Sequence, residues 1–300
     1  FLKRIINELI IFDVFLFKFI SFKKAVLPNL KSKDIIYISV PWFSAILNIL
    51  WIKQKVETII DYRDILVDNS IFSRNFFQNR IHYFLELFLL SKTSEILVTT
   101  KSAKIKMNYR KSTIVRNGIS KQELLLINKA KAIRNNESKK DLIYFGNLGN
   151  KRNAIKLFSL FNKELIDYEI YGSIDFSHGN IVNNRFKGFV DIDTLYSLIY
   201  SFKSVLIVIL PEEDSENAIP GKLYQIIATG LPIVLYSDKE SASKKYLESI
   251  KYEFLFIDCL NELYDQNEIK LKISSLKTDL FFDDIVIREK EYAKIKTIKC

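Results

Sequence analysis

The stretch NAIPGKLYQIIATGLPIV, residues 217–234, combines the signals of a short helix with those of a buried strand. Pro220 and Gly221 fit a helix start, because proline is tolerated in the first turn, where its missing N–H would lack a partner. Gly230 fits the helix end, since glycine readily takes the left-handed conformation found there. The apolar, β-branched residues that follow are typical of a strand. We therefore predict a helix over 221–229 whose first N–H groups are open to a ligand.

Short apolar runs alternate with segments of helical periodicity on both sides of this stretch. The predicted strands are residues 34–40, 56–61, 96–99, 112–116, 141–145, 168–172, 185–190, 204–210 and 231–236. The further helices with the clearest apolar stripe are residues 79–90 and 193–203. This alternation is typical of α/β proteins in which crossover helices cover a parallel sheet.

A polar stretch rich in lysine and asparagine, residues 119–140, interrupts the alternation, and we predict the domain linker there. The predicted domains are residues 1–125, residues 126–285 and a C-terminal helix or tail over 286–300. Ligands of parallel α/β sheets bind beyond the carboxyl ends of the strands. Two such units therefore predict two Rossmann-like domains whose sheets face a cleft.

Composition and charge narrow the class of protein. A hydrophobic share of 48% and a charged share of 27% indicate a folded globular chain and exclude a disordered one. The 45 Lys and Arg residues against 35 Asp and Glu residues give a net charge of +10, which attracts phosphate groups. These basic residues are scattered and accompany no nucleic-acid-binding motif, so we expect no nucleic acid as a partner.

The cysteines and histidines do not form a metal-binding pattern. Cys259 and Cys300 lie far apart, as do His82 and His178, and no ligand spacing of a zinc site results. We expect no metal and no disulfide framework, and the two cysteines fit the reducing cytoplasm.

The first 24 residues are rich in Phe, Ile and Leu, but Asn7, Glu8, Asp13 and Lys18 interrupt every apolar run. No run approaches the roughly 20 apolar residues of a spanning helix. We expect a helix buried on one face. Peripheral contact with a membrane surface is the second interpretation, because basic residues flank aromatic ones.

A glycine-containing turn after the strand at 141–145 has the residues of a pyrophosphate site. Gly146 and Gly149 permit a tight turn around Asn147, and Lys151 and Arg152 come where a helix is expected to start. Backbone N–H groups at a helix start bind phosphate, and a guanidinium strengthens the site. An ordinary strand–helix turn explains the same residues.

The helix predicted over 221–229 offers a second group of candidate residues. Its start, at Pro220 and Gly221, would present free N–H groups beside Lys222 to a phosphate or a sugar. Gln225 shares a side of the helix with Lys222, at a spacing of three residues, and could bond ribose hydroxyls. Asn217 precedes the helix in the same loop. A capped surface helix with a solvated lysine is the alternative.

This segment resembles the donor-binding segment of family 4 glycosyltransferases. The residues that fall in register with the family's pattern are Pro220, Lys222, Tyr224, Ala228, Gly230 and Pro232. The sequence DYRD at 61–64 is similar to the D-x-R-D loop of a bacterial polysaccharide subgroup. Further landmarks follow in the family's order at residues 98–101, 116–118, 144–149 and 188–190. Six landmarks in one order indicate this family.

The resemblance implies a GT-B fold, with two Rossmann-like domains, and an enzyme that transfers a hexose with retention of configuration and without a metal or cofactor. The donor would be a UDP- or GDP-sugar, and the acceptor a lipid-linked or cell-surface saccharide at the cytoplasmic face of the inner membrane. Arg152 and Lys222 would stabilise the leaving diphosphate. Asp61, Arg63 and Asp64 would face them from the first domain and orient donor or acceptor.

The sequence departs from the family in three respects. The family's Glu-x7-Glu pair falls on Asn217 and Gln225, so that both carboxylates are amides here. An arginine usual in the turn of the second domain is replaced by Asn147. One or two βα units normally precede the segment with which this sequence begins, so we expect an incomplete first domain and an impaired enzyme.

Two other functions stay open. A non-catalytic GT-B protein that binds a nucleotide sugar or a partner fits the two amides and the shortened first domain. A GT-B epimerase is less favoured, because it needs acid–base carboxylates and a histidine in the cleft, and neither His82 nor His178 falls at such a position.

Asp191 and Asp193 have the D-x-D spacing of a metal–diphosphate site. They directly precede the helix predicted over 193–203, where an aspartate commonly accepts hydrogen bonds from free N–H groups. We therefore predict that Asp191 caps this helix and binds no metal.

Overall fold

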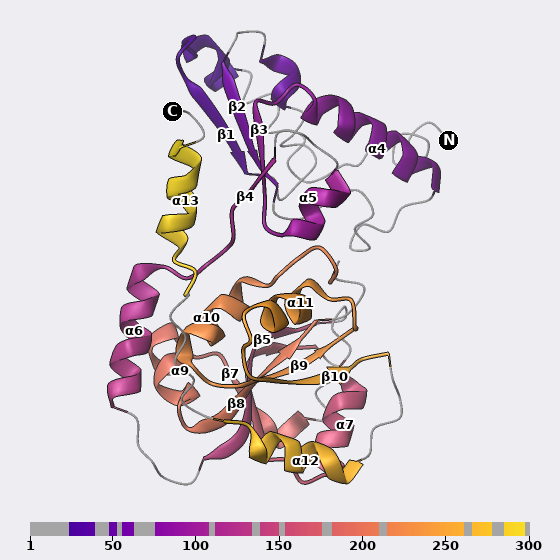
Figure 1. Cartoon of the computed structure of the whole chain (residues 1–300), viewed down its shortest axis with the longest axis vertical. Coiled ribbons are helices and arrows are strands. Elements are labelled where there is room, and N and C mark those ends of the chain that lie inside the picture. Colours follow the sequence, from indigo (N-terminus) through magenta and orange to yellow (C-terminus); the bar gives the residue numbers. More distant parts are fainter. Residues whose placement is uncertain are drawn as a thin grey trace. The chain divides into compact units, whose positions relative to one another are not determined.

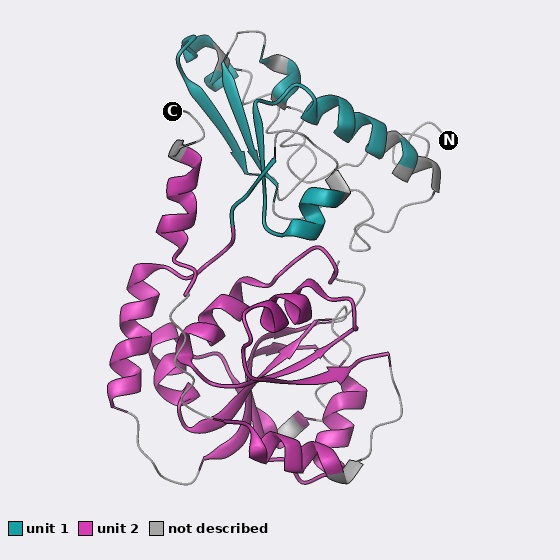
Figure 2. Cartoon of the chain, in the orientation of Figure 1, with its two compact units in different colours: residues 1–115 teal, residues 116–300 magenta. Residues whose placement is uncertain are grey.

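The computed structural model describes residues 24–39, 48–52, 56–62, 76–107, 112–133, 139–149, 154–175, 182–209, 215–260, 266–277 and 285–297. The chain divides into two compact units, residues 1–115 and residues 116–300 (Figure 2). Each unit is an α/β structure with a parallel sheet of its own (Figure 1). The expectations for residues 1–23 lie outside the described residues.

The first unit contains a four-stranded parallel sheet in the order β1-β2-β3-β4. Its strands are Ile35–Ser39 (β1), Glu57–Asp61 (β2), Glu95–Val98 (β3) and Ser112–Ile114 (β4). Its helices are Phe76–Leu90 (α4), Lys101–Met107 (α5) and the 3-10 helices Leu27–Asn29 (η1) and Asn48–Trp51 (η2). Ile38 and Ile60 of the sheet and Leu89 of α4 are buried in one apolar cluster. The strands and the helix predicted in this unit are confirmed.

The second unit contains a six-stranded parallel sheet in the order β10-β9-β8-β5-β6-β7. Its strands are Lys140–Leu148 (β5), Tyr168–Ile174 (β6), Phe186–Gly188 (β7), Phe202–Val208 (β8), Ile233–Ser237 (β9) and Phe254–Asp258 (β10). The chain adds β6 and β7 on one side of β5, and β8, β9 and β10 on the other. The order therefore reverses between β5 and β8, and at such a switch point the carboxyl edge of a parallel sheet can bind ligands.

Helices cover both faces of this sheet (Figure 1). The helices of the second unit are Lys121–Ala132 (α6), Ile155–Lys163 (α7), Ile192–Ile199 (α9), Gly221–Thr229 (α10), Ala242–Ser249 (α11), Gln266–Ser275 (α12), Arg288–Thr297 (α13) and the 3-10 helix Asn183–Arg185 (η3). Helices α9, α10 and α11 pack in one apolar cluster, and α7 and α12 pack in the other. The helix predicted over 221–229 coincides with α10, and the segment predicted as a C-terminal helix or tail contains α13.

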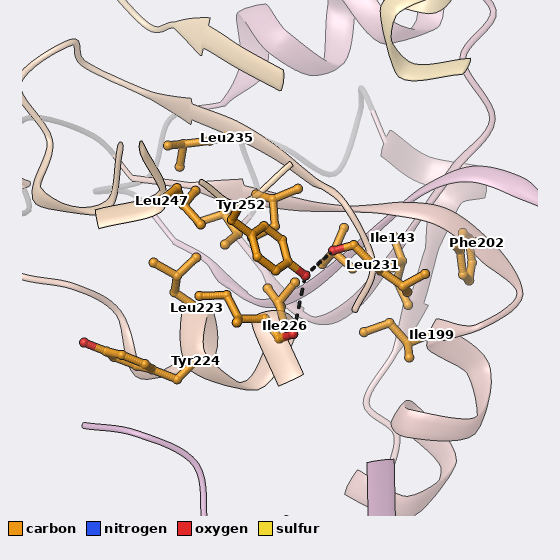
Figure 3. Close-up of a cluster of buried hydrophobic side chains, with 14 of the residues drawn as sticks. Ile143, Ile199, Phe202, Leu223, Tyr224, Ile226, Leu231, Leu235, Leu247 and Tyr252 are labelled. Carbon is orange, nitrogen blue, oxygen red and sulfur yellow. Dashed lines mark hydrogen bonds between the residues drawn. The ribbon is translucent and has the colours of Figure 1, made fainter. Parts of the chain in front are cut away.

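A buried tyrosine fixes the end of α10 against the sheet. The hydroxyl of Tyr252 donates hydrogen bonds to the carbonyl oxygens of Leu231, at 2.8 Å, and Ile227, at 3.4 Å (Figure 3). The second carbonyl belongs to the last turn of α10 and also accepts a hydrogen bond from the backbone N–H of Gly230, at 3.1 Å. Burial raises the pKa of Tyr252, so its hydroxyl remains a donor. The hydrogen bonds of Tyr252 thus anchor the C-terminal end of α10.

The polar stretch 119–140 is not the linker that its composition predicts, because residues 121–132 form α6. Ser120 and Glu123 make a capping box, in which each side chain accepts a hydrogen bond from the other residue's backbone N–H. Ile127 is fully buried and packs against α9 and α10. The units divide between residues 115 and 116, whereas the boundary expected after residue 125 would fall inside α6.

Candidate functional site

Two glycines bring β5 and β6 close together at their carboxyl ends. Gly146 pairs with Gly172 in the parallel register, with φ values of +123° and +126°. A Cβ atom on Gly172 would lie 2.2 Å from the carbonyl oxygen of Gly146, which no side chain permits. Sequence reasoning selected Gly146 and missed Gly172, because the need for the second glycine depends on the register of the strands.

Lys222, in the first turn of α10, lies against the end of β5. Its ammonium nitrogen is 3.5 Å from the carbonyl oxygen of Phe145 and 4.4 Å from the centre of the Tyr144 ring. A Cβ atom on Gly146 would lie 3.7 Å from the same nitrogen. The structure therefore brings Lys222 and Gly146 together, from the two segments that the sequence proposed independently.

The turn predicted from Gly146 onwards begins later than expected, because β5 runs on through Gly146 and Asn147 to Leu148. The hydroxyl of Tyr144 donates a hydrogen bond of 3.0 Å to the carbonyl oxygen of Asn147. A Cβ atom on Gly149 would lie 3.3 Å from the side-chain oxygen of Asn147, so this glycine leaves room for the amide. Lys151 and Arg152 lie outside the described residues, and their place at the site stays a prediction.

The start of α10 is open. Pro220 occupies the N-cap position and has no side-chain oxygen that could accept from the first N–H groups of the helix. A Cβ atom on Gly221 would meet no atom within 4 Å, so the first residue of α10 borders open space. The N–H of Leu223 bonds to the carbonyl oxygen of Pro220 at 3.0 Å, and the positive end of the helix dipole favours an anion. Together with the ammonium of Lys222, this end of α10 suits a phosphate group.

The loop that leads into α10 is fixed at both ends. The hydroxyl of Ser215 donates to the carboxylate of Asp238, which follows β9. The side-chain amide of Asn117 donates to the carbonyl oxygen of Ile219, at 3.4 Å. Between these anchors lies Asn217, whose side chain is buried. The loop thus presents α10 in a fixed position.

Gln225 lies one turn further along α10 and is half-buried. Its amide nitrogen donates a hydrogen bond of 2.7 Å to the carboxylate of Glu123, on α6. The nitrogen is therefore used within the protein, and contact of Gln225 with a ribose stays a prediction that concerns the amide oxygen. Sequence reasoning missed Glu123, which is 102 residues away from its partner.

In the first unit, Asp61 is the last residue of β2 and is buried. Its carboxylate accepts a hydrogen bond from the hydroxyl of Tyr37, on β1. Arg63 and Asp64, the other two charged residues of this motif, lie outside the described residues. A role of the three charged residues towards donor or acceptor stays a prediction.

Asp191 caps α9, as the sequence predicts. The carboxylate accepts hydrogen bonds from the backbone N–H of Thr194, at 2.8 Å, and from its hydroxyl, at 2.6 Å. These bonds lower the pKa of Asp191. Across the described ranges, no group of three or more His, Cys, Asp and Glu side chains could hold a metal ion. Within the same ranges, no helix is long and apolar enough to cross a membrane.

No protein-family model and no curated protein matches this sequence. Solved structures, by contrast, match along most of the chain. Sucrose-phosphate synthase from Thermosynechococcus elongatus matches with a TM-score of 0.70 and 12% identity, over 95% of this chain and 78% of that one. HepE of Anabaena, in complex with UDP, matches with a TM-score of 0.65 and 14% identity, over 94% and 81% of the two chains. The apo structure of OtsA matches with a TM-score of 0.63 and 10% identity, over 95% and 77%.

The chain has the GT-B fold. The predicted fold class, α/β with a parallel sheet in each of two Rossmann-like units, is confirmed. At these identities the likeness establishes the fold alone, so the family 4 resemblance and the incomplete first domain stay predictions. In this GT-B chain the candidate site is the carboxyl edge of the second sheet, where α10 begins.

Proposed function

We propose that this GT-B protein is a glycosyltransferase that binds a nucleotide-diphosphate sugar at the start of α10. The observation that carries the proposal is the position of Lys222, whose ammonium lies beside Gly146 at the carboxyl end of β5. A cation next to the positive end of a helix dipole matches the charge of a diphosphate. HepE, which shares the fold, was solved with UDP, and UDP is therefore the first nucleotide to test.

In the proposed reaction, the bond between the anomeric carbon and the diphosphate breaks, the acceptor oxygen bonds to the anomeric carbon, and the proton of the acceptor hydroxyl is released with the nucleoside diphosphate. Negative charge grows on the leaving diphosphate as this bond breaks. The ammonium of Lys222 and the N–H groups at the start of α10 lie where they would stabilise that charge, and Arg152 would add a guanidinium. The aromatic ring of Tyr144 holds the ammonium by a cation–π contact at 4.4 Å and leaves its charge in place.

The finer assignments rest on the family 4 resemblance of the sequence. They are transfer of a hexose with retention of configuration and without a divalent metal, from UDP or GDP, to a lipid-linked or cell-surface saccharide. The net charge of +10 supports peripheral contact with an anionic membrane face in the bacterial cytoplasm. NMR spectroscopy of the product would show the configuration at the anomeric carbon, and an inverted product would remove the retaining assignment.

A non-catalytic nucleotide-sugar-binding protein is the second candidate. The hydrogen bond between Gln225 and Glu123 favours it, because the amide nitrogen is used inside the protein and no carboxylate stands at position 225. Sugar release from a panel of UDP- and GDP-sugars separates the two candidates, with the melting temperature of the protein as the binding signal. An enzyme releases sugar from at least one donor. A donor that raises the melting temperature without any release supports the second candidate.

A protein whose melting temperature no UDP- or GDP-sugar changes, and which releases no sugar, would contradict both candidates. Lys272→Ala is the matched control for effects of lost charge. This lysine lies on α12, which packs on the opposite face of the sheet, and it pairs with Glu268 at 2.7 Å. The control variant is expected to bind and release as the wild type does.

A further inference from the structure

Glu123 links three helices of the second unit. One oxygen of its carboxylate accepts the amide hydrogen bond of Gln225, on α10, at 2.7 Å. The other oxygen accepts from the backbone N–H and the hydroxyl of Ser120, at 3.0 and 2.7 Å, and from the guanidinium of Arg288, on α13, at 3.4 Å. Both oxygens therefore have fixed partners, and the side chain is held in one orientation.

This carboxylate remains ionised at neutral pH. Burial raises the pKa of Glu123. Hydrogen bonds from Ser120 and Gln225 and the charge of Arg288 lower it by more, so that the net shift is downward. An ionised carboxylate only accepts hydrogen bonds. The group of Gln225 that faces Glu123 must therefore be the amide nitrogen, and the amide oxygen must point elsewhere.

The same contact explains why position 225 carries an amide. A glutamate at this position would place a second carboxylate at hydrogen-bond distance from Glu123, and two like charges at this distance repel each other. The two positions thus form a pair that accommodates one carboxylate and one amide. Exchange of the two groups would keep both the hydrogen bond and the total charge.

Position 225 lies on the side of α10 that carries the candidate site. Gln225 follows Gly221 by four residues and Lys222 by three, so the three positions share one face of the helix. The other residues of α10 are buried. An oriented acceptor on this face lies one helical turn from the proposed diphosphate position.

We propose that Glu123 is a positioning residue for the donor, which directs the amide oxygen of Gln225 towards a ribose hydroxyl. The proposal rests on the proposed function, since it needs a nucleotide at the start of α10. Glu123 itself touches no ligand. Its effect is to select one of the two orientations of the amide, so that a hydroxyl meets an acceptor.

Affinity for two nucleotides measures this role. UDP carries the ribose hydroxyls, and 2′,3′-dideoxy-UDP lacks them. In the wild type we expect UDP to bind roughly 3- to 10-fold more tightly, the value of one hydrogen bond. Glu123→Gln leaves the orientation of Gln225 undetermined, so that this preference falls towards 1 while the affinity for 2′,3′-dideoxy-UDP stays the same.

The exchanged variant, Glu123→Gln with Gln225→Glu, restores a single orientation of the pair. Its carboxylate at position 225 also accepts from a ribose hydroxyl, so the preference for UDP returns. Gln225→Glu alone puts two carboxylates together and is expected to lower both stability and UDP affinity. Glutamine is accepted at the third position of a capping box, so the exchange leaves the start of α6 intact.

Ser120→Ala is the control for a purely structural role. It removes the hydroxyl from the capping box and lowers stability, but leaves the bond between Glu123 and Gln225. This variant is expected to keep the wild-type preference for UDP. A preference that follows stability, with loss in Ser120→Ala as well, would overturn the positioning role.

The outcomes also separate this inference from the proposed function. If the wild type binds neither UDP nor GDP, both the proposed function and the positioning role are contradicted. If the wild type binds UDP and Glu123→Gln keeps the full preference over 2′,3′-dideoxy-UDP, only the positioning role is contradicted.

Discussion

The two edges of the second sheet hold their lysines in different ways. At the amino edge, Lys203 pairs with Asp141 at 2.8 Å, and Lys140 pairs with Glu169. At the carboxyl edge, the ammonium of Lys222 lies against a carbonyl oxygen and an aromatic ring. A carboxylate partly neutralises an ammonium, whereas an aromatic ring attracts the ammonium without carrying a charge of its own. Ion pairs hold the amino edge, and the carboxyl edge is the one that we propose for binding.

The largest effect on stability is expected from Gly172→Ala, which would force β5 and β6 apart at the carboxyl edge. The new Cβ atom would lie 2.2 Å from the carbonyl oxygen of Gly146, at a φ of +126°. We expect a loss of about 2–4 kcal/mol in the free energy of unfolding, measured by urea denaturation. Gly221→Ala is the control, because its Cβ atom would meet nothing within 4 Å. Equal stability of the two variants would show that β5 and β6 do not approach as described.

The direct test of the comparison is an alanine substitution of one lysine at each edge. Lys222→Ala is expected to lower sugar transfer by at least ~100-fold, because the leaving diphosphate loses its cation. Lys203→Ala removes the same charge from the amino edge and is expected to lower stability alone. Initial rates of sugar release check both variants. Equal rates in Lys222→Ala and in the wild type would remove Lys222 from the site.

Arg152→Ala extends this test to a predicted site residue that lies outside the described part of the second unit. The resemblance places its guanidinium at the diphosphate, and we expect a loss of transfer of at least ~100-fold, as for Lys222→Ala. A folded variant with the wild-type rate would contradict this role and leave Lys222 as the proposed cation.

The ring beneath the ammonium allows a finer test. Tyr144→Leu removes the cation–π contact at 4.4 Å and is expected to raise the Kd for UDP by about 2- to 5-fold. Tyr144→Phe keeps the ring and loses the hydroxyl that bonds to Asn147, so its Kd is expected to stay near that of the wild type. Isothermal titration calorimetry distinguishes the variants. The same Kd in all three proteins would show that the ring does not position Lys222.

The smallest effect concerns the amino edge at acid pH. Burial raises the pKa of Glu169, but hydrogen bonds from Lys140 and Tyr171 and the charge of Lys140 bring it below its usual 4.5. A lowered pKa stabilises the fold above pH 4.5, and this contribution is lost as the pH falls through the folded-state value. Glu169→Gln should therefore flatten the fall of the free energy of unfolding below pH 4.5.

Urea unfolding at a series of pH values measures this change. The exposed Glu248, on α11, pairs with Lys244 of its own helix, and Glu248→Gln is the control that should keep the wild-type slope. A Glu169→Gln slope equal to that of the wild type would show that the pair with Lys140 does not contribute.

Local signals made part of this structure readable from the sequence. Pro220, Gly221 and Gly230 set both ends of α10, and the residues of a helix end act within one turn. The cap at Asp191 was predictable for the same reason. The helix α6 was not predicted, because its many lysines made the segment look like a linker. The capping box of Ser120 and Glu123 was the local signal that could have indicated its start.

Contacts between distant segments were beyond sequence reasoning. The need for Gly172 follows from its register with Gly146, and a strand pattern alone does not fix the register of two strands. The bond between Gln225 and Glu123 joins residues 102 positions apart. Sequence comparison marked the amide at position 225 as a departure, and only the fold shows its partner.

A crystal structure of the full chain with UDP tests the central claim most directly. We expect a diphosphate oxygen at about 2.7–2.9 Å from the ammonium nitrogen of Lys222, with further oxygens facing the first N–H groups of α10. A UDP molecule bound with its diphosphate away from both Lys222 and the start of α10 would contradict the account.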